Sequence, residues 1–216
     1  MNTYVGDTAA LNDPKYFKKS YNYMDDARKA KIDRLRFKKD KILSLGAGMI
    51  IQFALFIEGH EGAEIATTPS GKPYVKDVDN LFINVSHSGT KVLCVSGEYP
   101  VGCDIEQIGE PSMAVAKRTF SRRELENTIF MDDREFKDYY FKIWTAKESY
   151  LKLTGEGLTR PLNELSIHVP FANQSVEKGK ERATFFDIDC GEGYQGTICV
   201  QNACQGVPIY RYKYML

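Results

Sequence analysis

The hydrophobic and polar positions of this 216-residue chain first follow a helical pattern and then a strand pattern. Residues 13–41 are polar and typical of helix, and the apolar stretch that follows predicts a buried helix over 42–57. Three short β-rich runs come next, at 81–85, 91–95 and 101–106, and the first two predict a hairpin or two neighbouring strands. The first part of the chain therefore predicts helices followed by a small sheet.

The second part of the chain repeats this order. Ser121 and Glu124 have the spacing of a capping box, which predicts the start of a helix. A long helix is predicted over 135–153, and Gly155 and Gly157 are expected to end it. Strand-like runs follow at 165–169, 183–188 and 196–200.

The repeated order of helix and strands predicts an α+β fold built from two similar halves, residues 1–103 and 104–216. Each half is expected to be a small, mostly antiparallel sheet packed on a long helix. No clean internal sequence repeat accompanies the two halves.

Composition excludes several classes of protein. Lysine plus arginine equals aspartate plus glutamate at 29 each, so net charge gives no attraction to nucleic acid or membrane. Three histidines and five cysteines without a CxxC pair make a zinc site unexpected, and reduced buried thiols are typical of a cytosolic protein. The chain shows no signal-peptide pattern, and its apolar stretch is shorter than the roughly 20 residues that span a bilayer. We expect a cytoplasmic protein.

A GxGxxG match at residues 191–196 is expected to be a simple turn. A dinucleotide-binding loop needs a following helix, whereas this match is followed by β-branched residues that are typical of a strand.

Two acidic side chains stand in the strand-like run at 102–106. Strand side chains alternate between faces, so Asp104 and Glu106 point the same way, roughly 6–7 Å apart along the strand. Two carboxylates on one face repel each other unless a cation compensates them. The alternative is an exposed strand end with two solvated acids.

The predicted helix carries a second charged group. Trp144, Glu148, Leu151 and Lys152 share one face by their helical spacing. Glu148 and Lys152 are spaced for a surface ion pair worth about 0.3–0.5 kcal/mol. Their place on a face with Trp144 and Leu151 favours a functional role instead, because charges on an apolar face usually have a partner.

Two further segments are ambiguous on their own. His87 lies between two serines in the segment 84–88, which is most often a turn. The run 28–41 holds eight basic residues against Asp33 and Asp40, and is either a solvated helix face or a binding site for phosphate.

Taken together and in this order, these segments resemble the 4′-phosphopantetheinyl transferases of the surfactin-synthetase-activating (Sfp) type. The shared blocks are a GKP turn at 71–73, an N-x-SHS segment at 84–88, a G-x-D-x-E strand at 102–106 and a W-x-x-K-E-x-x-x-K helix at 144–152. Weaker likeness is present at 116–121 and 155–158. The resemblance covers residues 71–158 firmly and the remainder loosely.

The resemblance implies transfer of the phosphopantetheine arm of coenzyme A to a serine of an apo carrier protein, with release of 3′,5′-ADP. Asp104, Glu106 and Glu148 would hold Mg²⁺, or Mn²⁺, against the pyrophosphate of coenzyme A, since Mg²⁺ prefers oxygen ligands. Glu148 is implied as the general base, with Glu106 or a metal-bound water as alternatives. Lys152 would offset charge on the phosphates.

The resemblance also implies how coenzyme A is held. Ser86, His87 and Lys72 match positions that contact its phosphates. The basic run would supply a cation to the 3′-phosphate, from Arg36, the best match, or from Lys31, Arg34 or Lys41.

The expected partner is an apo acyl, peptidyl or aryl carrier protein. Its acidic helix would be attracted by the basic side chains Lys117, Arg118, Arg122 and Arg123. The chain length favours a monomeric pseudo-dimer with the active site between its halves. Two other functions stay open: a magnesium-dependent hydrolase of nucleotide pyrophosphates that uses the same acids, and a non-catalytic carrier-binding module.

Overall fold

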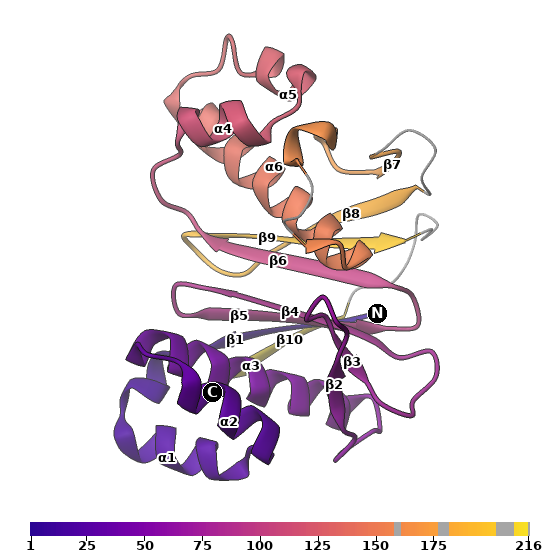
Figure 1. Ribbon diagram of the computed structural model, residues 1–216. Coiled ribbons are helices and arrows are strands. Elements are labelled where there is room, and N and C mark those ends of the chain that lie inside the picture. The colour runs from indigo at the N-terminus through magenta and orange to yellow at the C-terminus, as the bar shows by residue number, and fades with distance from the viewer. Residues whose placement is uncertain (158–160, 177–181, 202–209, 216) are drawn as a thin grey trace.

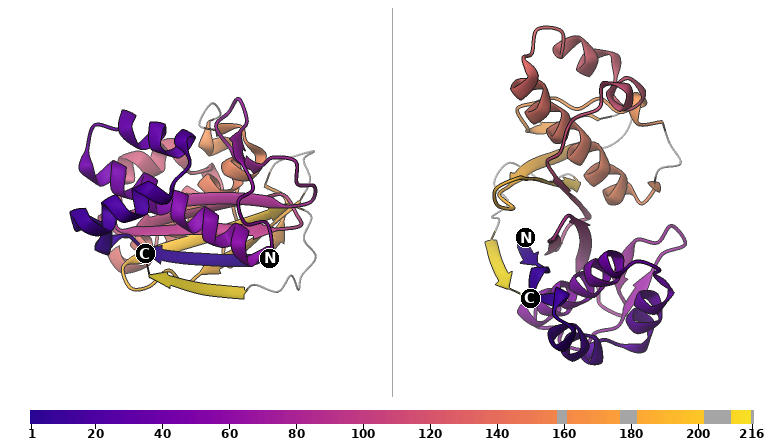
Figure 2. Two further views of the ribbon diagram at one scale, coloured as in Figure 1. Left: turned by 90° about the horizontal axis from the view of Figure 1, so that it is seen from below. Right: turned by 90° about the vertical axis from the view of Figure 1, so that its left-hand side faces the viewer.

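The computed structural model describes residues 1–157, 161–176 and 182–201, and the backbone of a last strand at 210–215. Two four-stranded sheets lie face to face at the centre, and helices cover their outer faces (Figures 1 and 2). The molecule is therefore layered as helix, sheet, sheet and helix, in which each sheet buries one face on a helix and the other on the second sheet.

The first sheet has the strand order β10-β1-β5-β4. Its strands pair antiparallel, except that β10 runs parallel to β1. A separate two-stranded hairpin, β2 with β3, lies beside it. The strands are β1 (Asn2–Asp7), β2 (Ile65–Thr67), β3 (Pro73–Val75), β4 (Phe82–Ser88), β5 (Lys91–Gly97) and β10 (Tyr210–Met215).

One long helix, α3 (Lys38–Ile57), covers the outer face of this sheet. Its side chains Ile50 and Ile51 form a core with Tyr4 and Val92 of the sheet. Three shorter helices pack on the other side of α3: η1 (Ala9–Asn12), α1 (Pro14–Tyr23) and α2 (Asp26–Arg34).

The second sheet has the order β6-β9-β8-β7 and is antiparallel throughout. The long helix α6 packs on its outer face, and the shorter helices pack on α6. The elements are β6 (Val101–Gln107), α4 (Met113–Thr119), α5 (Arg122–Asn127), α6 (Asp133–Thr154), η3 (Leu162–Glu164), β7 (Asn173–Gln174), β8 (Ala183–Ile188) and β9 (Tyr194–Gln201).

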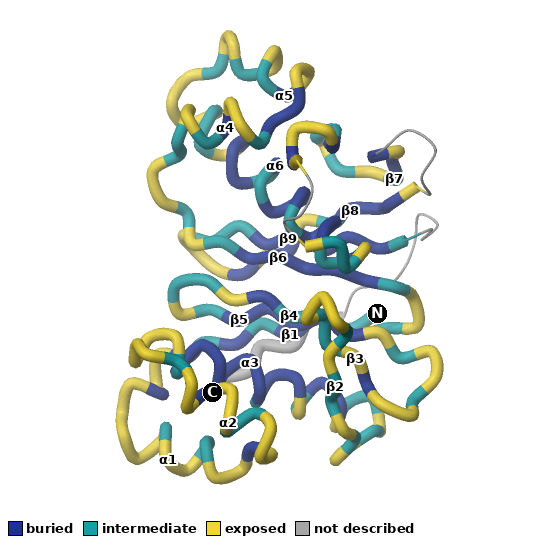
Figure 3. Tube along the Cα trace, in the orientation of Figure 1, coloured by how far each residue is buried: buried dark blue, intermediate teal, exposed yellow. Residues whose placement is uncertain are grey.

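The inner faces of the two sheets share one apolar core. Leu93 and Val95 of β5 meet Cys103 and Ile105 of β6 and Ile198 of β9, all of them buried. Buried positions accordingly follow α3, α6 and the central strands in Figure 3.

The predicted α+β fold class is confirmed, with a mainly antiparallel sheet on a long helix in each part. The predicted hairpin forms from β4 and β5, and the capping box at Ser121 and Glu124 is present. Gly155 ends α6 in the left-handed conformation at φ 74°. The segment at 191–196 is a turn leading into β9, as expected.

One predicted helical segment is divided, and one predicted strand is wrong. The helical run 13–41 is divided, because Met24 is extended and the Asp25 carboxylate accepts from Arg28 N to begin a new helix. The run 165–169 is not a strand. Leu165 and Ile167 are buried, but the Ile167 N–H donates to the Glu124 carboxylate rather than to a neighbouring strand.

The predicted division into 1–103 and 104–216 stays a prediction. Residue 103 lies inside β6, and β10 returns from the end of the chain to the first sheet. Of the predicted helix end at 155–158, residue 158 lies outside the described residues.

One helix of the described chain, α3, is long and apolar enough to cross a membrane. Such a helix is weak evidence for a membrane span, because the core helix of a soluble protein can have the same length and composition. Most of its apolar stretch is buried within the molecule.

Candidate active site at the seam of the two sheets

The edge strands β4 and β6 run side by side where the two sheets meet, and we call this line the seam. Side chains of β4 connect them. Asn84 Oδ1 accepts from the backbone N–H of Cys103 at 2.9 Å. Ser86 and Ser88, at the following alternate positions, donate to the carboxylates of Asp104 and Glu106, each at 2.8 Å. The serines of the SHS segment thus hold the acids of the DxE strand.

Asp104 is buried at 3% exposure and lies against a cation. Lys152 Nζ lies 2.7 Å from Asp104 Oδ1 and donates to Ser86 Oγ at 2.7 Å. Burial alone would lower the pKa of Lys152, but Asp104 raises it above its usual value. The second oxygen, Asp104 Oδ2, is buried and has no hydrogen-bond partner among the residues that the structure describes. The expected alternative of a Glu148–Lys152 ion pair is wrong, because Lys152 pairs with Asp104.

Both oxygens of Glu106 have neutral donors. Ser88 Oγ donates to Oε2 at 2.8 Å and Trp144 Nε1 to Oε1 at 3.3 Å. Burial raises the pKa of Glu106, and repulsion from Asp104 raises it further, against the two hydrogen bonds.

Glu148 is half-buried, and no hydrogen bond or ion pair joins it to another described residue. Burial raises the pKa of Glu148, and so do the charges of Asp104 and Glu106, while Lys152 opposes them. The three acids are therefore close enough to influence one another. Within the described residues, however, no three histidine, cysteine or acidic side chains converge closely enough to hold a metal ion as they stand.

The other side of β4 faces basic groups. Desolvation, together with the ammonium groups of Lys152 and Lys31, lowers the pKa of His87, whereas Asp40 opposes the shift. Burial and the neighbouring Arg28 likewise lower the pKa of Lys31. The cations of Lys152, Lys31 and Arg28 therefore form one positive region around His87 and beside the acids, which is suited to an anionic ligand.

Arg28 was not among the residues predicted for the site. It is half-buried, donates to the carbonyl of Ser44 at 3.5 Å, and packs so closely on α3 that a Cβ at Gly48 would meet its side chain at 3.1 Å. The Ser44 hydroxyl beside it is buried without a partner. The sequence around Arg28 does not distinguish it from the other seven basic residues of 28–41, because its packing on α3 depends on the tertiary structure.

Two predicted residues contact groups away from the acids, and a third has no such contact among the described residues. Lys72 Nζ donates to the carbonyl of Leu153 at 2.7 Å, near the end of α6, and burial lowers its pKa. The guanidinium of Arg36 lies over the ring of Phe37 at 5.4 Å. Lys41, in α3, has no hydrogen bond or ion pair from its ammonium group to the described residues. Their roles toward a ligand stay predictions.

Close packing brings α6 to the seam. A Cβ at Gly102 would lie 2.0 Å from the carbonyl oxygen of Ser149 and 2.4 Å from the amide nitrogen of Leu153. The helix therefore rests on the backbone of β6, which brings Glu148 and Lys152 beside the strand of Asp104.

The acids, the adjacent cation and the positive region are an arrangement typical of proteins that bind phosphate-bearing ligands together with a metal ion. The model of the 4′-phosphopantetheinyl transferase superfamily matches residues 100–199, which include all three acids. The chain is 33% identical to the 4′-phosphopantetheinyl transferase Sfp of Bacillus subtilis (strain 168) over 137 residues, 62% of this chain and 61% of that protein. It is 28% identical to a second 4′-phosphopantetheinyl transferase of Bacillus subtilis over 197 residues, 88% of each.

These matches confirm the resemblance: the chain is similar to the 4′-phosphopantetheinyl transferases of the Sfp type. The match spans less than two thirds of the length of Sfp. A solved structure, the holo-[acyl-carrier-protein] synthase of Thermotoga maritima, overlaps 48% of this chain and 62% of that chain with 17% identity and a TM-score of 0.37, which is too little to define a shared fold.

Proposed function

We propose that this protein transfers the 4′-phosphopantetheine arm of coenzyme A to a serine of an apo carrier protein, with Mg²⁺ bound and 3′,5′-ADP released. The observation that carries the proposal is the group of three electrostatically coupled acids at the seam, with Lys152 on Asp104 and a positive region beside them. The similarity to two 4′-phosphopantetheinyl transferases supports the reaction class.

The chemistry of the three acids suits a magnesium ion, which would have to draw them together, because they do not converge on one point as they stand. Asp104, Glu106 and Glu148 offer only carboxylate oxygens, the ligands that Mg²⁺ prefers. Asp104 Oδ2 is a buried acceptor without a donor, which is a costly state unless a cation occupies it. Once bound, Mg²⁺, or Mn²⁺ in its place, would neutralise charge on the pyrophosphate.

Glu148 is the favoured general base for the carrier serine. Glu106 already accepts two hydrogen bonds, whereas Glu148 accepts none from the described residues. Its raised pKa brings it closer to neutral pH, where a base is most effective. A metal-bound water or Glu106 remains an alternative.

Basic and polar groups would hold coenzyme A. Lys152 and Ser86 already form a hydrogen-bonded pair beside Asp104 and would contact the pyrophosphate. His87 and Lys31, with Arg28, would receive a phosphate in the positive region. Lys72, Arg36 and Lys41 are kept as further candidates.

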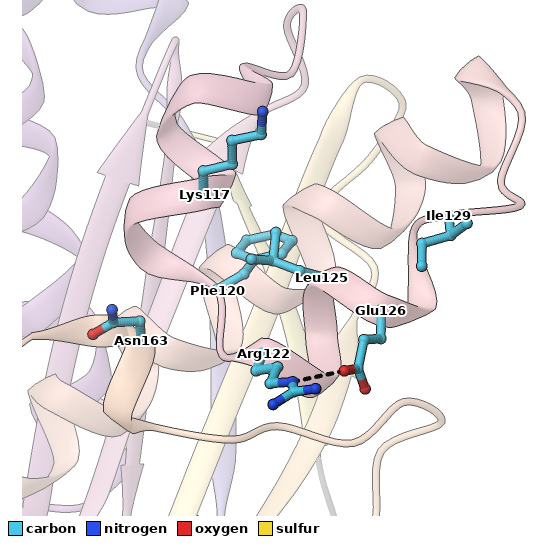
Figure 4. A pocket seen from close by; sticks show the side chains of 7 residues that line it. All are labelled: Lys117, Phe120, Arg122, Leu125, Glu126, Ile129 and Asn163. Carbon is cyan, nitrogen blue, oxygen red and sulfur yellow. Dashed lines mark hydrogen bonds and ion pairs between the residues drawn. The ribbon is translucent and has the colours of Figure 1, made fainter.

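The carrier protein would approach from α4 and α5. Lys117, Arg118, Arg122 and Arg123 are all exposed there, and Glu126 is paired with Arg122. An open groove of about 590 Å³ lies between α4, α5 and η3 (Figure 4), apart from the acids of the seam. An excess of exposed positive charge would steer an acidic helix.

One experiment tests the proposed reaction. The protein is mixed with coenzyme A, Mg²⁺ and an apo carrier protein, and the carrier is weighed by intact mass spectrometry. A phosphopantetheine adduct is expected, and it should disappear in Asp104→Ala and Glu148→Ala but persist in Glu192→Ala, an exposed acid in the turn before β9. Hydrolysis of coenzyme A without an adduct would favour the hydrolase, and carrier binding without turnover the non-catalytic module.

A charge reversal tests the docking surface. Changing Arg118 and Arg123 to Glu should weaken carrier binding and leave the affinity for coenzyme A unchanged. The control reverses Lys18 and Lys19, two exposed lysines of α1. Unchanged carrier kinetics in the first variant would exclude this surface.

A monomeric, cytoplasmic enzyme is proposed, and the mass in solution by light scattering would test whether it is a monomer.

A further inference from the structure

The carboxylate of Glu106 is held differently from the other two acids. Asp104 forms an ion pair with Lys152, and Glu148 has no hydrogen bond or ion pair with the described residues. Each oxygen of Glu106, in contrast, accepts one hydrogen bond from a neutral donor. The donors come from opposite sides of the seam, Ser88 from β4 and Trp144 from α6.

The direction of the Ser88 hydrogen bond is determined by a third group. Ser88 Oγ accepts from the backbone N–H of Gln107 at 3.0 Å, so its single proton is free to donate to Glu106. Because Ser88 Oγ accepts from Gln107, we infer that its proton points to the Glu106 carboxylate.

Trp144 is fixed by aromatic packing. Its indole stacks on Tyr140 with ring centroids 6.4 Å apart and planes 4° apart, and Tyr140 packs in turn on Phe120 and Phe141. The indole N–H can only donate, so its hydrogen bond selects an acceptor oxygen.

We propose that Ser88 and Trp144 are positioning residues that hold the Glu106 carboxylate in one orientation for the metal ion. The inference rests on the proposed function, in which Glu106 is a metal ligand. A carboxylate oxygen has two acceptor sites, so one hydrogen bond to each oxygen leaves one site on each for the ion. Groups that orient a metal ligand typically change metal affinity by about 10- to 100-fold when they are removed.

Metal affinity is the direct test. Mn²⁺ binding to the full chain is measured by electron paramagnetic resonance of the free ion, with coenzyme A present and no carrier protein. Ser88→Ala and Trp144→Phe should each weaken binding by about tenfold or more. Ser88→Thr keeps the hydroxyl and should bind as the unaltered protein does, and Ser20→Ala, a serine of α1 away from the seam, is the matched control. Far-ultraviolet circular dichroism checks that each variant is folded.

Trp144 supplies a second readout, because it is the only tryptophan in the chain. Mn²⁺ should change its fluorescence in the unaltered protein and in Ser20→Ala, and the change should be lost in Glu106→Gln. Folded Ser88→Ala and Trp144→Phe variants with unchanged Mn²⁺ affinity would overturn the inference, even if the carrier is modified. If the unaltered protein does not modify the carrier, but the variants show the expected differences in Mn²⁺ affinity, the proposed function would be overturned and the inference about Ser88 and Trp144 would stand.

Discussion

Replacing Gly102 by Ala should displace α6 from the seam. The added Cβ would lie 2.0 Å from the carbonyl oxygen of Ser149, where contacts are favourable only from roughly 3.5 Å, so the helix must move by about 1.5 Å. Both nearest groups are backbone atoms, so no change of side-chain rotamer can relieve the overlap. Overpacking of this kind typically costs about 1–3 kcal/mol of stability.

The same displacement should affect the proposed reaction. Glu148 and Lys152 are carried by α6, and a misplacement of about 1 Å at a reacting centre can lower the rate by roughly 100-fold. Guanidinium denaturation and the rate of carrier modification measure the two effects separately.

Gly109→Ala is the matched control, because a Cβ there has no atom within 4 Å. Substituting glycine by alanine at an unstrained position normally stabilises a protein by about 0.4–1 kcal/mol, which is the opposite sign. If Gly102→Ala had the denaturation midpoint and transfer rate of Gly109→Ala, the argument that α6 rests on the β6 backbone would be refuted.

Two further predictions concern charged groups. Glu124 and Lys147 form an ion pair in which each side chain is 1% exposed, so Glu124→Gln should lower the free energy of unfolding by about 3–5 kcal/mol in urea denaturation. The double variant Glu124→Gln with Lys147→Met should recover part of the lost free energy of unfolding, because it also removes the buried positive charge. If nothing is recovered, the unpaired charge of Lys147 is not the cause of the loss. Glu148→Gln should stabilise the metal-free protein at pH 7, because the folded pKa of Glu148 is raised and stability falls as pH rises from the unfolded to the folded value. Thermal melts from pH 4 to 8 should show this fall flattened in Glu148→Gln and unchanged in Glu192→Gln.

Features set by local rules were predictable from the sequence. The period of strand side chains put Asp104 and Glu106 on one face, and both accept from serines of the same neighbouring strand. The capping box at Ser121 was also predictable, because it depends on two residues three positions apart.

Features set by tertiary contacts were not predictable. The partner of Lys152 looked like Glu148 from helical spacing, but Lys152 pairs with the buried Asp104 of β6, the strand on which α6 packs. The segment at 165–169 alternates like a strand, yet the carboxylate of Glu124 takes the Ile167 N–H that a neighbouring strand would need. Neither partner is close in sequence, so no local pattern indicates it.

The seam explains why the site lies where two edge strands meet. No backbone ladder joins β4 to β6 in the described sheets, so polar side chains must connect them. The serine hydroxyls connect the strands by donating to carboxylates, and the proposed metal ion would use those same carboxylates. Ser86 and Ser88 therefore both connect the two sheets and orient the carboxylates, whereas in a continuous sheet the backbone pairing itself would connect the strands.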